Sequence, residues 1–280
     1  MYKNCLFTLT TVVGVGSSIP MKFQPIQKTL SLTALAMVFA LSAANLRADH
    51  HQQILELRKY VCSNKAQHDQ VSQYLKTALI PALNRMDVKN VGVWEAHDKE
   101  KDGLHIWALV PFNSLDHYST YGANLVADTQ FHNDGAEYLF LENKKQKAYE
   151  RIEITLMGAF SGWPKATKAH DGDKLYELRD YESFSEYKGL MKVQMFNDGE
   201  IDIFNKTGLD GIFFGHVLAG KNAPNLVYMA SFKDMEERDA NWKKFIDHPD
   251  WKAMSKEEQY AQTVSKIHQT FLVAKPYSQL

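Results

Sequence analysis

Residues 174–181 read Lys-Leu-Tyr-Glu-Leu-Arg-Asp-Tyr, and residues 53–60 read Gln-Ile-Leu-Glu-Leu-Arg-Lys-Tyr. Both stretches contain Glu-Leu-Arg-x-Tyr, and their β-favouring residues alternate with other residues, which is typical of a strand. Because side chains alternate across a strand, the Glu, Arg and Tyr of each copy share one face and the leucines share the other. A stretch that occurs twice in this way indicates a duplicated domain.

The repeat extends beyond these two strands. Three further pairs of segments recur in the same order: 92–97 with 211–216, 106–108 with 227–229, and 151–157 with 266–272. Apolar residues at helical spacing predict helices at 66–86, 115–129, 186–206 and from Met235 onward. We expect Pro81 to kink the first helix, Asn197-Asp198-Gly199 to bend the third, and residues 130–149 to be less regular.

Each half therefore has the predicted order β-α-β-β-α-β. The fold class is α+β, with two ferredoxin-like units in tandem at residues 52–158 and 172–280. Residues 159–173 read as a linker, because Gly, Pro and polar residues dominate there without any period.

The first 48 residues have a different character. Basic residues at Lys22 and Lys28 precede an apolar run over 30–41, and small residues stand at Ala44 and Ala48. This pattern is typical of a secretory signal peptide, cleaved after Ala48 or after Ala44. We expect a periplasmic or secreted protein without a membrane span once residues 1–48 are removed. Two alternatives stay open: an uncleaved N-terminal anchor, and a true start at Met21.

Composition excludes several classes of protein. The chain has 280 residues, of which 45% are hydrophobic, and a formal net charge of −1, so nothing indicates a nucleic-acid partner. No Gly-rich phosphate loop, nucleophile elbow or nucleotide fingerprint occurs. No His-x-x-x-His or Cys-x-x-Cys spacing indicates a metal site. Cys5 lies in the predicted signal peptide, which leaves Cys62 without an intrachain disulfide partner.

Residues 176–181, 195–201, 215–232, 235–239, Trp242 and 276–278 carry a resemblance to a known family. On these residues the second copy resembles the NIPSNAP family over residues 175–280, and the first looks like a diverged copy. The resemblance implies a fold similar to the dimeric α+β barrel, in which two βαββαβ units pair their sheets face to face, here as a pseudo-dimer within one chain. That superfamily includes cofactor-free monooxygenases, isomerases and haem proteins, so the resemblance implies no particular reaction.

The space between two such sheets is a natural ligand pocket, and we expect the polar strand faces to point into it. Each Glu/Arg pair either holds the two halves in register or leaves an Arg to bind a carboxylate or oxyanion, with a Tyr as donor or acid. His97 and His216 fall at matching strand ends. Each is either a residue of the pocket rim, or a functional group that acts as a general base, a haem ligand or a metal ligand. The candidate residues are Glu56, Arg58, Tyr60, His97, Glu177, Arg179, Tyr181 and His216.

Two hypotheses of function remain. In the first, the protein binds a small apolar or aromatic molecule between its sheets, either as a binding protein or as a cofactor-free monooxygenase or haem-binding protein. In the second, it is a non-catalytic binding or scaffold module, in which the inward-pointing charged side chains only stabilise the fold. An aromatic-lined cavity with an unpaired Arg or His favours the first, and a filled interior with closed ion pairs favours the second. No cofactor is expected, with haem as the alternative, and homodimerisation stays open.

Overall fold

The structure is a computed structural model that describes residues 52–98, 104–141 and 147–280. The predicted signal peptide lies outside these residues. Residues Ala48–Leu280 form one compact unit. Within it, each half has the order β-α-β-β-α-β that the repeat predicts.

Polar side chains cap the starts of the two longest helices of the first half. Asn64 and Ser114 accept hydrogen bonds from the backbone N–H groups of Gln67 and His117, at 3.0 and 3.1 Å. Residues 130–149, expected to be less regular, contain most of one short helix and all of another. The elements of this half are β1 (Ile54–Val61), α2 (Lys65–Tyr74), the π turn η2 (Leu75–Leu79), α3 (Ile80–Arg85), β2 (Gly92–Ala96), β3 (Ile106–Phe112), α4 (Leu115–Ala127), α5 (Thr129–Asp134), α6 (Ala136–Leu139) and β4 (Arg151–Ala159).

The second half repeats this series, with a short 3₁₀ turn where the first half has α6. The bend expected at residues 197–199 is a π turn, and the first half has a π turn at the equivalent place, just before Pro81. At the start of α9, Asp234 accepts a hydrogen bond from the Glu237 N–H at 2.9 Å. The elements are β5 (Leu175–Glu182), α7 (Glu186–Met195), η3 (Phe196–Glu200), α8 (Ile201–Thr207), β6 (Asp210–Ala219), β7 (Asn225–Phe232), α9 (Met235–Asp247), α10 (Pro249–Met254), η4 (Glu258–Tyr260) and β8 (Lys266–Ala274).

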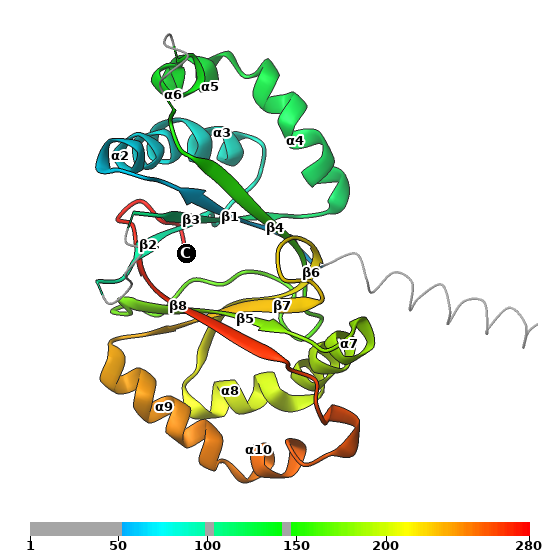
Figure 1. Ribbon diagram of the computed structural model, residues 1–280. Coiled ribbons are helices and arrows are strands. Elements are labelled where there is room, and N and C mark those ends of the chain that lie inside the picture. Colours follow the sequence, from blue (N-terminus) through cyan, green and yellow to red (C-terminus); the bar gives the residue numbers. More distant parts are fainter. Residues whose placement is uncertain (1–51, 99–103, 142–146) are drawn as a thin grey trace, which may run out of the picture. The chain divides into compact units, whose positions relative to one another are not determined.

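The eight strands close into one barrel in the order β1-β3-β2-β8-β5-β7-β6-β4. Each half supplies four neighbouring strands, and the halves join at two antiparallel seams, β2 with β8 and β4 with β6. Closure leaves no unpaired sheet edge. Helices α2 to α6 cover the outer face of one half, and α7 to α10 cover the other (Figure 1). The predicted pseudo-dimer of ferredoxin-like units is therefore confirmed.

The polar strand faces do not point between the sheets, and that expectation is wrong. Leu55 and Leu57 pack inside the barrel among large apolar side chains from both halves, whereas Tyr60 packs against the helices. The physical reason is that the barrel centre needs apolar side chains from both sheets, while the helices bring polar groups that satisfy buried charges. Glu56, Arg58, Glu177 and Arg179 therefore lie between sheet and helices.

One end of the barrel is closed by the linker and the C-terminal tail. The Gln53 N–H donates to the Pro164 carbonyl at 2.9 Å, and the Ala166 N–H donates to Gln53 Oε1 at 2.8 Å. The tail follows β2, where the Val93 N–H donates to Ser278 Oγ at 2.9 Å, and the chain ends between the two sheets (Figure 1). Any opening of the barrel must therefore lie at the other end, where β1 and β5 finish.

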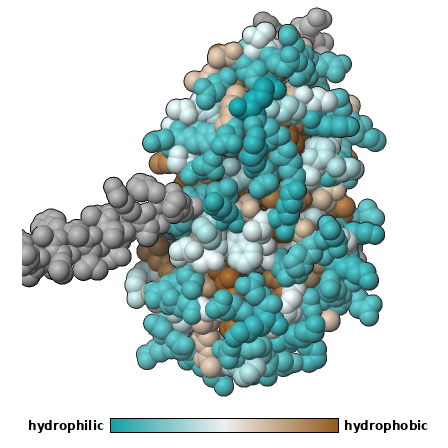
Figure 2. Space-filling model, turned by 180° about the vertical axis from the view of Figure 1, so that it is seen from behind, coloured by the Kyte–Doolittle hydropathy of each residue, from teal (hydrophilic) through white to brown (hydrophobic). Residues whose placement is uncertain are grey.

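The surface in Figure 2 is mostly hydrophilic, with small separate apolar patches. No helix in the three described ranges is long and apolar enough to cross a membrane. Cys62 is buried and forms no disulfide, and burial raises the pKa of its thiol to about 11. It is therefore a neutral structural side chain at physiological pH, not a nucleophile.

Candidate functional site

A carboxylate that accepts hydrogen bonds from four side chains lies beneath α9 in the second half. Glu177, 1% exposed, accepts hydrogen bonds from Arg179 Nε at 2.6 Å and from Arg238 Nε and Nη2 at 2.9 and 2.8 Å. Trp242 Nε1 donates at 2.8 Å and Gln269 Nε2 at 2.5 Å. Burial opposes ionisation, but Arg238, Arg179 and Trp242 hold the pKa of Glu177 below its ordinary value. The carboxylate is thus ionised and fully paired.

Arg179 joins this carboxylate to a buried pair of phenols. Its Nη1 donates to the Tyr181 hydroxyl at 2.9 Å, and that hydroxyl shares a hydrogen bond of 2.9 Å with Tyr228. Its guanidinium stacks 3.9 Å from the centre of the Trp242 ring. Burial raises the pKa of Tyr181, so its phenol stays neutral. Glu177, Arg179 and Tyr181, three of the predicted candidates, therefore come together as expected, although beneath the helices.

Arg179 and Tyr181 border a pocket of about 390 Å³, which we call the helix-side pocket. Its volume falls within the range of small-molecule sites, ~300–1,000 Å³. Apolar and aromatic side chains form most of the wall, and four charged side chains complete it. The lining residues are Arg179, Tyr181, Lys192, Glu200, Arg238, Trp242, Phe245, Ile246, Trp251, Val264 and Ile267.

A buried ion pair forms another part of this wall. Lys192 Nζ lies 2.6 Å from Glu200 Oε2, and both side chains are about 95% buried. The amine also faces the rings of Phe196 and Trp251, at 4.7 and 5.4 Å from their centres. Burial raises the pKa of Glu200. A carboxyl–amine pair beside an apolar pocket is able to exchange a proton with a bound molecule.

The first half has the same Glu-Arg-Tyr face but not the same charges around it. Glu56 is paired with Arg58, which also donates to the Tyr121 hydroxyl at 2.9 Å. At the positions of Lys192, Glu200 and Arg238 the first half has Val71, Leu79 and Tyr118. Aromatic rings pack there instead, with Tyr74 stacked on Tyr138 at 3.7 Å. The charged helix-side pocket therefore belongs to the second half.

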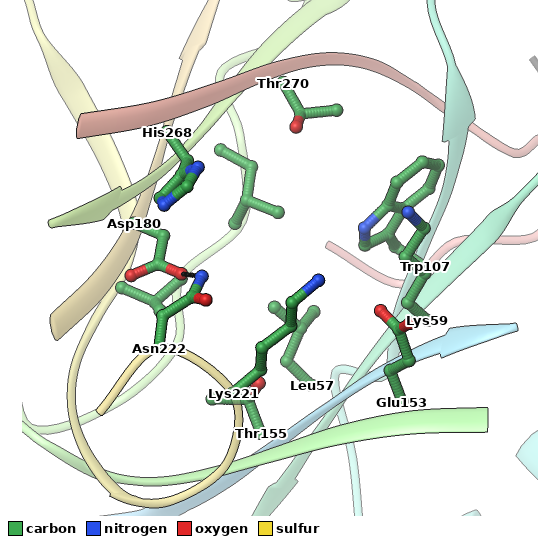
Figure 3. A pocket seen from close by; sticks show the side chains of 12 residues that line it. Leu57, Lys59, Trp107, Glu153, Thr155, Asp180, Lys221, Asn222, His268 and Thr270 are labelled. Carbon is green, nitrogen blue, oxygen red and sulfur yellow. Dashed lines mark hydrogen bonds between the residues drawn. The ribbon is translucent and has the colours of Figure 1, made fainter. Parts of the chain in front are cut away.

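A second cavity, of about 240 Å³, lies inside the barrel at its open end, and we call it the mouth cavity. Figure 3 shows Lys221 reaching from the β6–β7 turn toward the cavity, with Asp180 and His268 on one side and Lys59 and Trp107 on the other. None of the candidate residues predicted from the sequence lines it. The other lining residues are Leu57, Glu153, Thr155, Leu178, Asn222, Val227 and Thr270.

The predicted histidines border neither of these cavities. His216 lies within β6, opposite Leu226 and Gly158, not at the end of the strand, and burial lowers its pKa. His97 follows β2, and its N–H donates to the Phe271 carbonyl at 2.9 Å. The two residues are therefore not brought together with the Arg and Tyr candidates.

The described residues do not fit a haem. An iron ligand must stand beside a cavity large enough for the ring. The helix-side pocket has no His, Cys or Met in its wall, and its Tyr181 hydroxyl is already bonded to Arg179 and Tyr228. His268 borders only the smaller mouth cavity. Among the described residues, no group of three or more His, Cys, Asp or Glu side chains is placed to hold a metal ion.

Comparison with known proteins agrees with this architecture. A candidate monooxygenase from Lactobacillus acidophilus is 12% identical, with a TM-score of 0.53 over 80% of this chain and 94% of that one. Another, from Fusobacterium nucleatum, is 12% identical, with a TM-score of 0.51 over 80% and 93%. At such identities the likeness shows the fold alone. The protein is a tandem α+β barrel whose fold is similar to that of these two structures.

The second half has a family assignment of its own. Residues 176–279 match the NIPSNAP family model, so this half is a NIPSNAP domain, as the sequence resemblance indicates. A NIPSNAP-like domain protein from Burkholderia xenovorans is 18% identical, with a TM-score of 0.34 over 39% of this chain and 90% of that one. No curated protein matches the chain significantly.

Sequence reasoning missed four side chains of the helix-side pocket and its network: Lys192, Arg238, Trp242 and Gln269. Two signals in the sequence point to Arg238, Trp242 and Lys192, and neither points to Gln269. Arg238 and Trp242 are four residues apart, on one face of α9. Lys192 and Glu200 are opposite charges eight residues apart, about two helical turns, among apolar neighbours.

Proposed function

We propose that the NIPSNAP half binds a small molecule with an apolar or aromatic body and an anionic group, in the helix-side pocket. The observation that carries the proposal is a charge imbalance around an apolar wall. Arg179, Arg238 and Lys192 supply three positive charges, against which Glu177 and Glu200 supply two negative ones. Because a buried positive charge needs a partner, the pocket favours an anion over a neutral or cationic molecule.

The exposed rim does not remove this imbalance. Arg238 Nη1 also contacts Asp239 Oδ1 at 2.8 Å, but the Asp239 side chain is 66% exposed, so solvent screens the pair. The Arg238 side chain is 16% exposed. An anionic group that displaces water beside Arg238 therefore gains a charge-assisted hydrogen bond in a partly dehydrated site.

The rest of the wall suits an aromatic body. Trp242, Trp251 and Phe245 border the pocket together with Ile246, Val264 and Ile267. Phe245 and Trp251 pack at 4.5 Å between ring centres, which fixes their orientation before a ligand enters. The barrel centre is filled with apolar side chains, so a site midway between the two sheets, as first hypothesised, is less favoured.

The function that we propose is binding, and oxygenation of the bound molecule is the first reaction to test. Two structures of the same fold are named as candidate monooxygenases. In this pocket, Lys192 with Glu200 is the pair able to remove a proton from an aromatic ligand.

A non-catalytic module remains the second candidate, and the closed ion pairs favour it. Arg58 and Arg179 are both paired with their own Glu, and neither is left open for a ligand. On this hypothesis the networks only fix the helices to the sheets.

Native mass spectrometry of the purified protein tests the proposal. We expect a retained anionic aromatic molecule, released on denaturation and absent from Arg238→Gln. Arg85→Gln is the control, because Arg85 lies on the surface of the first half and pairs with Asp128. A retained molecule that is neutral or cationic, or one that survives in Arg238→Gln, would contradict the proposal.

We also propose that the protein is exported to a periplasm or secreted. The basic start, apolar run and small residues of 21–48 support this. Mass spectrometry of the mature protein should give an N-terminus near Asp49. A cytosolic protein that retains residues 1–48 would contradict it.

A further inference from the structure

We propose that the mouth cavity is a second binding site, independent of the helix-side pocket, for a small zwitterion such as an amino acid with a short apolar side chain. The cavity of about 240 Å³ is smaller than the ~300–1,000 Å³ of sites for drug-sized molecules. Its lining includes the apolar side chains Leu57, Leu178, Val227 and Trp107 and the charged side chains Lys59, Glu153, Asp180 and Lys221.

Equivalent positions of the two halves face each other across this cavity. β1 and β5 lie on opposite sides of the barrel, so Lys59 stands where the other half has Asp180. Each of the two is in register with a second lining residue on a neighbouring strand, Lys59 with Glu153 and Asp180 with His268. The duplication has therefore placed residues of opposite charge at matching positions of one cavity.

The wall from the first half, together with the β6–β7 turn, is positive. Glu153 already pairs with Arg151, at 2.8 Å from its Nη2. Burial opposes ionisation, but Arg151, Lys221 and Lys59 hold the pKa of Glu153 below its ordinary value. Lys59 and Lys221 thus line this wall beside a carboxylate that Arg151 already pairs. Lys221 has no hydrogen-bond or ion-pair partner in the described part of the chain, which leaves its amine available for a ligand carboxylate.

The opposite wall is negative. Asp180 is half-buried and accepts hydrogen bonds from Asn222 Nδ2 at 2.8 Å and Asn225 Nδ2 at 2.6 Å. Each carboxylate oxygen of Asp180 thus accepts from one of these side-chain amides, which leaves it a lone pair for a further donor. His268 Nε2 lies 2.5 Å from Glu182 Oε1, so any charge on this imidazole is already paired. A ligand ammonium group at Asp180 and a carboxylate at Lys221 would match both walls.

Three probes of nearly the same shape separate the two charges. L-Valine carries both, 3-methylbutanoate lacks the ammonium group, and 2-methylpropylamine lacks the carboxylate. We expect L-valine to bind more tightly than either of the other two in calorimetric titration of the whole protein. Equal binding of L-valine and the better single-charge probe, or no saturable binding of any of the three, would overturn the proposal.

Two variants assign the charges to their walls. Lys221→Gln should weaken L-valine and 3-methylbutanoate about tenfold and leave 2-methylpropylamine unchanged, because one charge-assisted contact is lost. Asp180→Asn should weaken L-valine and the amine and leave the acid unchanged. Lys165→Gln, an exposed lysine of the linker, is the matched control. Equal effects of Lys221→Gln and Lys165→Gln would overturn the assignment.

The same titrations separate this site from the helix-side pocket. Lys221 is exposed, so its substitution should not disturb folding, and thermal melting of each variant checks this. Arg238→Gln, which should impair the helix-side pocket, should bind L-valine as the unaltered protein does. Loss of L-valine binding in Arg238→Gln but not in Lys221→Gln would place the zwitterion elsewhere and refute the proposal.

Discussion

Glu177 accepts hydrogen bonds from four side chains, and its loss should cost more than that of any exposed carboxylate. Replacing it by Gln removes the carboxylate that pairs with Arg179 and leaves Arg238 with the solvent-exposed Asp239 alone. We expect Glu177→Gln to lower the free energy of unfolding by ~3–5 kcal/mol. Glu236→Gln, an exposed change in the first turn of α9, should change it by less than ~0.5 kcal/mol. Urea unfolding measures both, and equal effects would show that the network is not what stabilises this face.

The Glu177 carboxylate should also make the stability of the folded protein depend on pH. Its pKa in the folded protein is lowered from the ordinary value of 4.5, so its stabilisation is fully present above pH 4.5. The stabilisation should be lost as pH falls through the lower folded-state pKa. The difference in unfolding free energy between the unaltered protein and Glu177→Gln should therefore shrink with acidification below pH 4.5. A difference that grows in that range would contradict the lowered pKa.

The two repeated arginines should not be equally important. In the described residues, Arg58 is the only cation within ion-pair distance of Glu56, which is fully buried. Glu177 has Arg238 in addition to Arg179. Arg58→Ala should therefore destabilise the protein by ~3–5 kcal/mol, and Arg179→Ala by less. Equal losses in urea unfolding would mean that Arg238 does not compensate for Arg179.

At the scale of elements, the sequence could predict where strands and helices lie but not which strand face is buried where. The alternation of side chains along a strand places Leu55 and Leu57 on one face and Glu56 and Arg58 on the other. It does not determine which face packs against the helices. Both sets are in fact buried, because helices α4 and α9 bring Tyr121 and Arg238 over the polar face. That match depends on residues far away in the sequence, and a single strand does not reveal it.

Helix ends give a prediction at the same scale. Gly208 ends α8 with φ = 78°, and a Cβ there would lie 2.9 Å from Asn241 Nδ2. Gly208→Ala should cost ~1–2 kcal/mol, because the left-handed conformation is strained for residues with a Cβ. Gly122→Ala, inside α4 with open space around it, should stabilise by ~0.5–1 kcal/mol. Thermal melting should show opposite shifts, and shifts of the same sign would contradict this account of the helix end.

At the scale of the whole molecule, both seams and the linker tie the two halves together. The β4–β6 and β2–β8 pairings close the barrel, and the Thr167 N–H donates to the Ile212 carbonyl at 2.9 Å. The repeat in the sequence predicts the two halves and their pairing. It does not predict the helix-side pocket, which depends on differences between the copies at Lys192 and Arg238.

Because both halves contribute strands to one closed barrel, we predict that they unfold together. Leu83 is fully buried beneath the first-half helices, and Leu83→Ala should cost ~2–5 kcal/mol. Tryptophan fluorescence and far-UV circular dichroism should report one transition, and both should shift together in the variant. Two separate transitions, of which Leu83→Ala moves only one, would mean that the halves are independent domains.

Calorimetric titration with 2-naphthoate and 2-naphthamide tests the central claim most directly, because the two molecules differ in charge and hardly in shape. We predict that the acid binds the unaltered protein ~10- to 100-fold more tightly than the amide, and that Arg238→Gln removes this preference while Arg85→Gln keeps it. Equal affinity for acid and amide, or a preference that persists in Arg238→Gln, would contradict an anion-binding pocket in the NIPSNAP half.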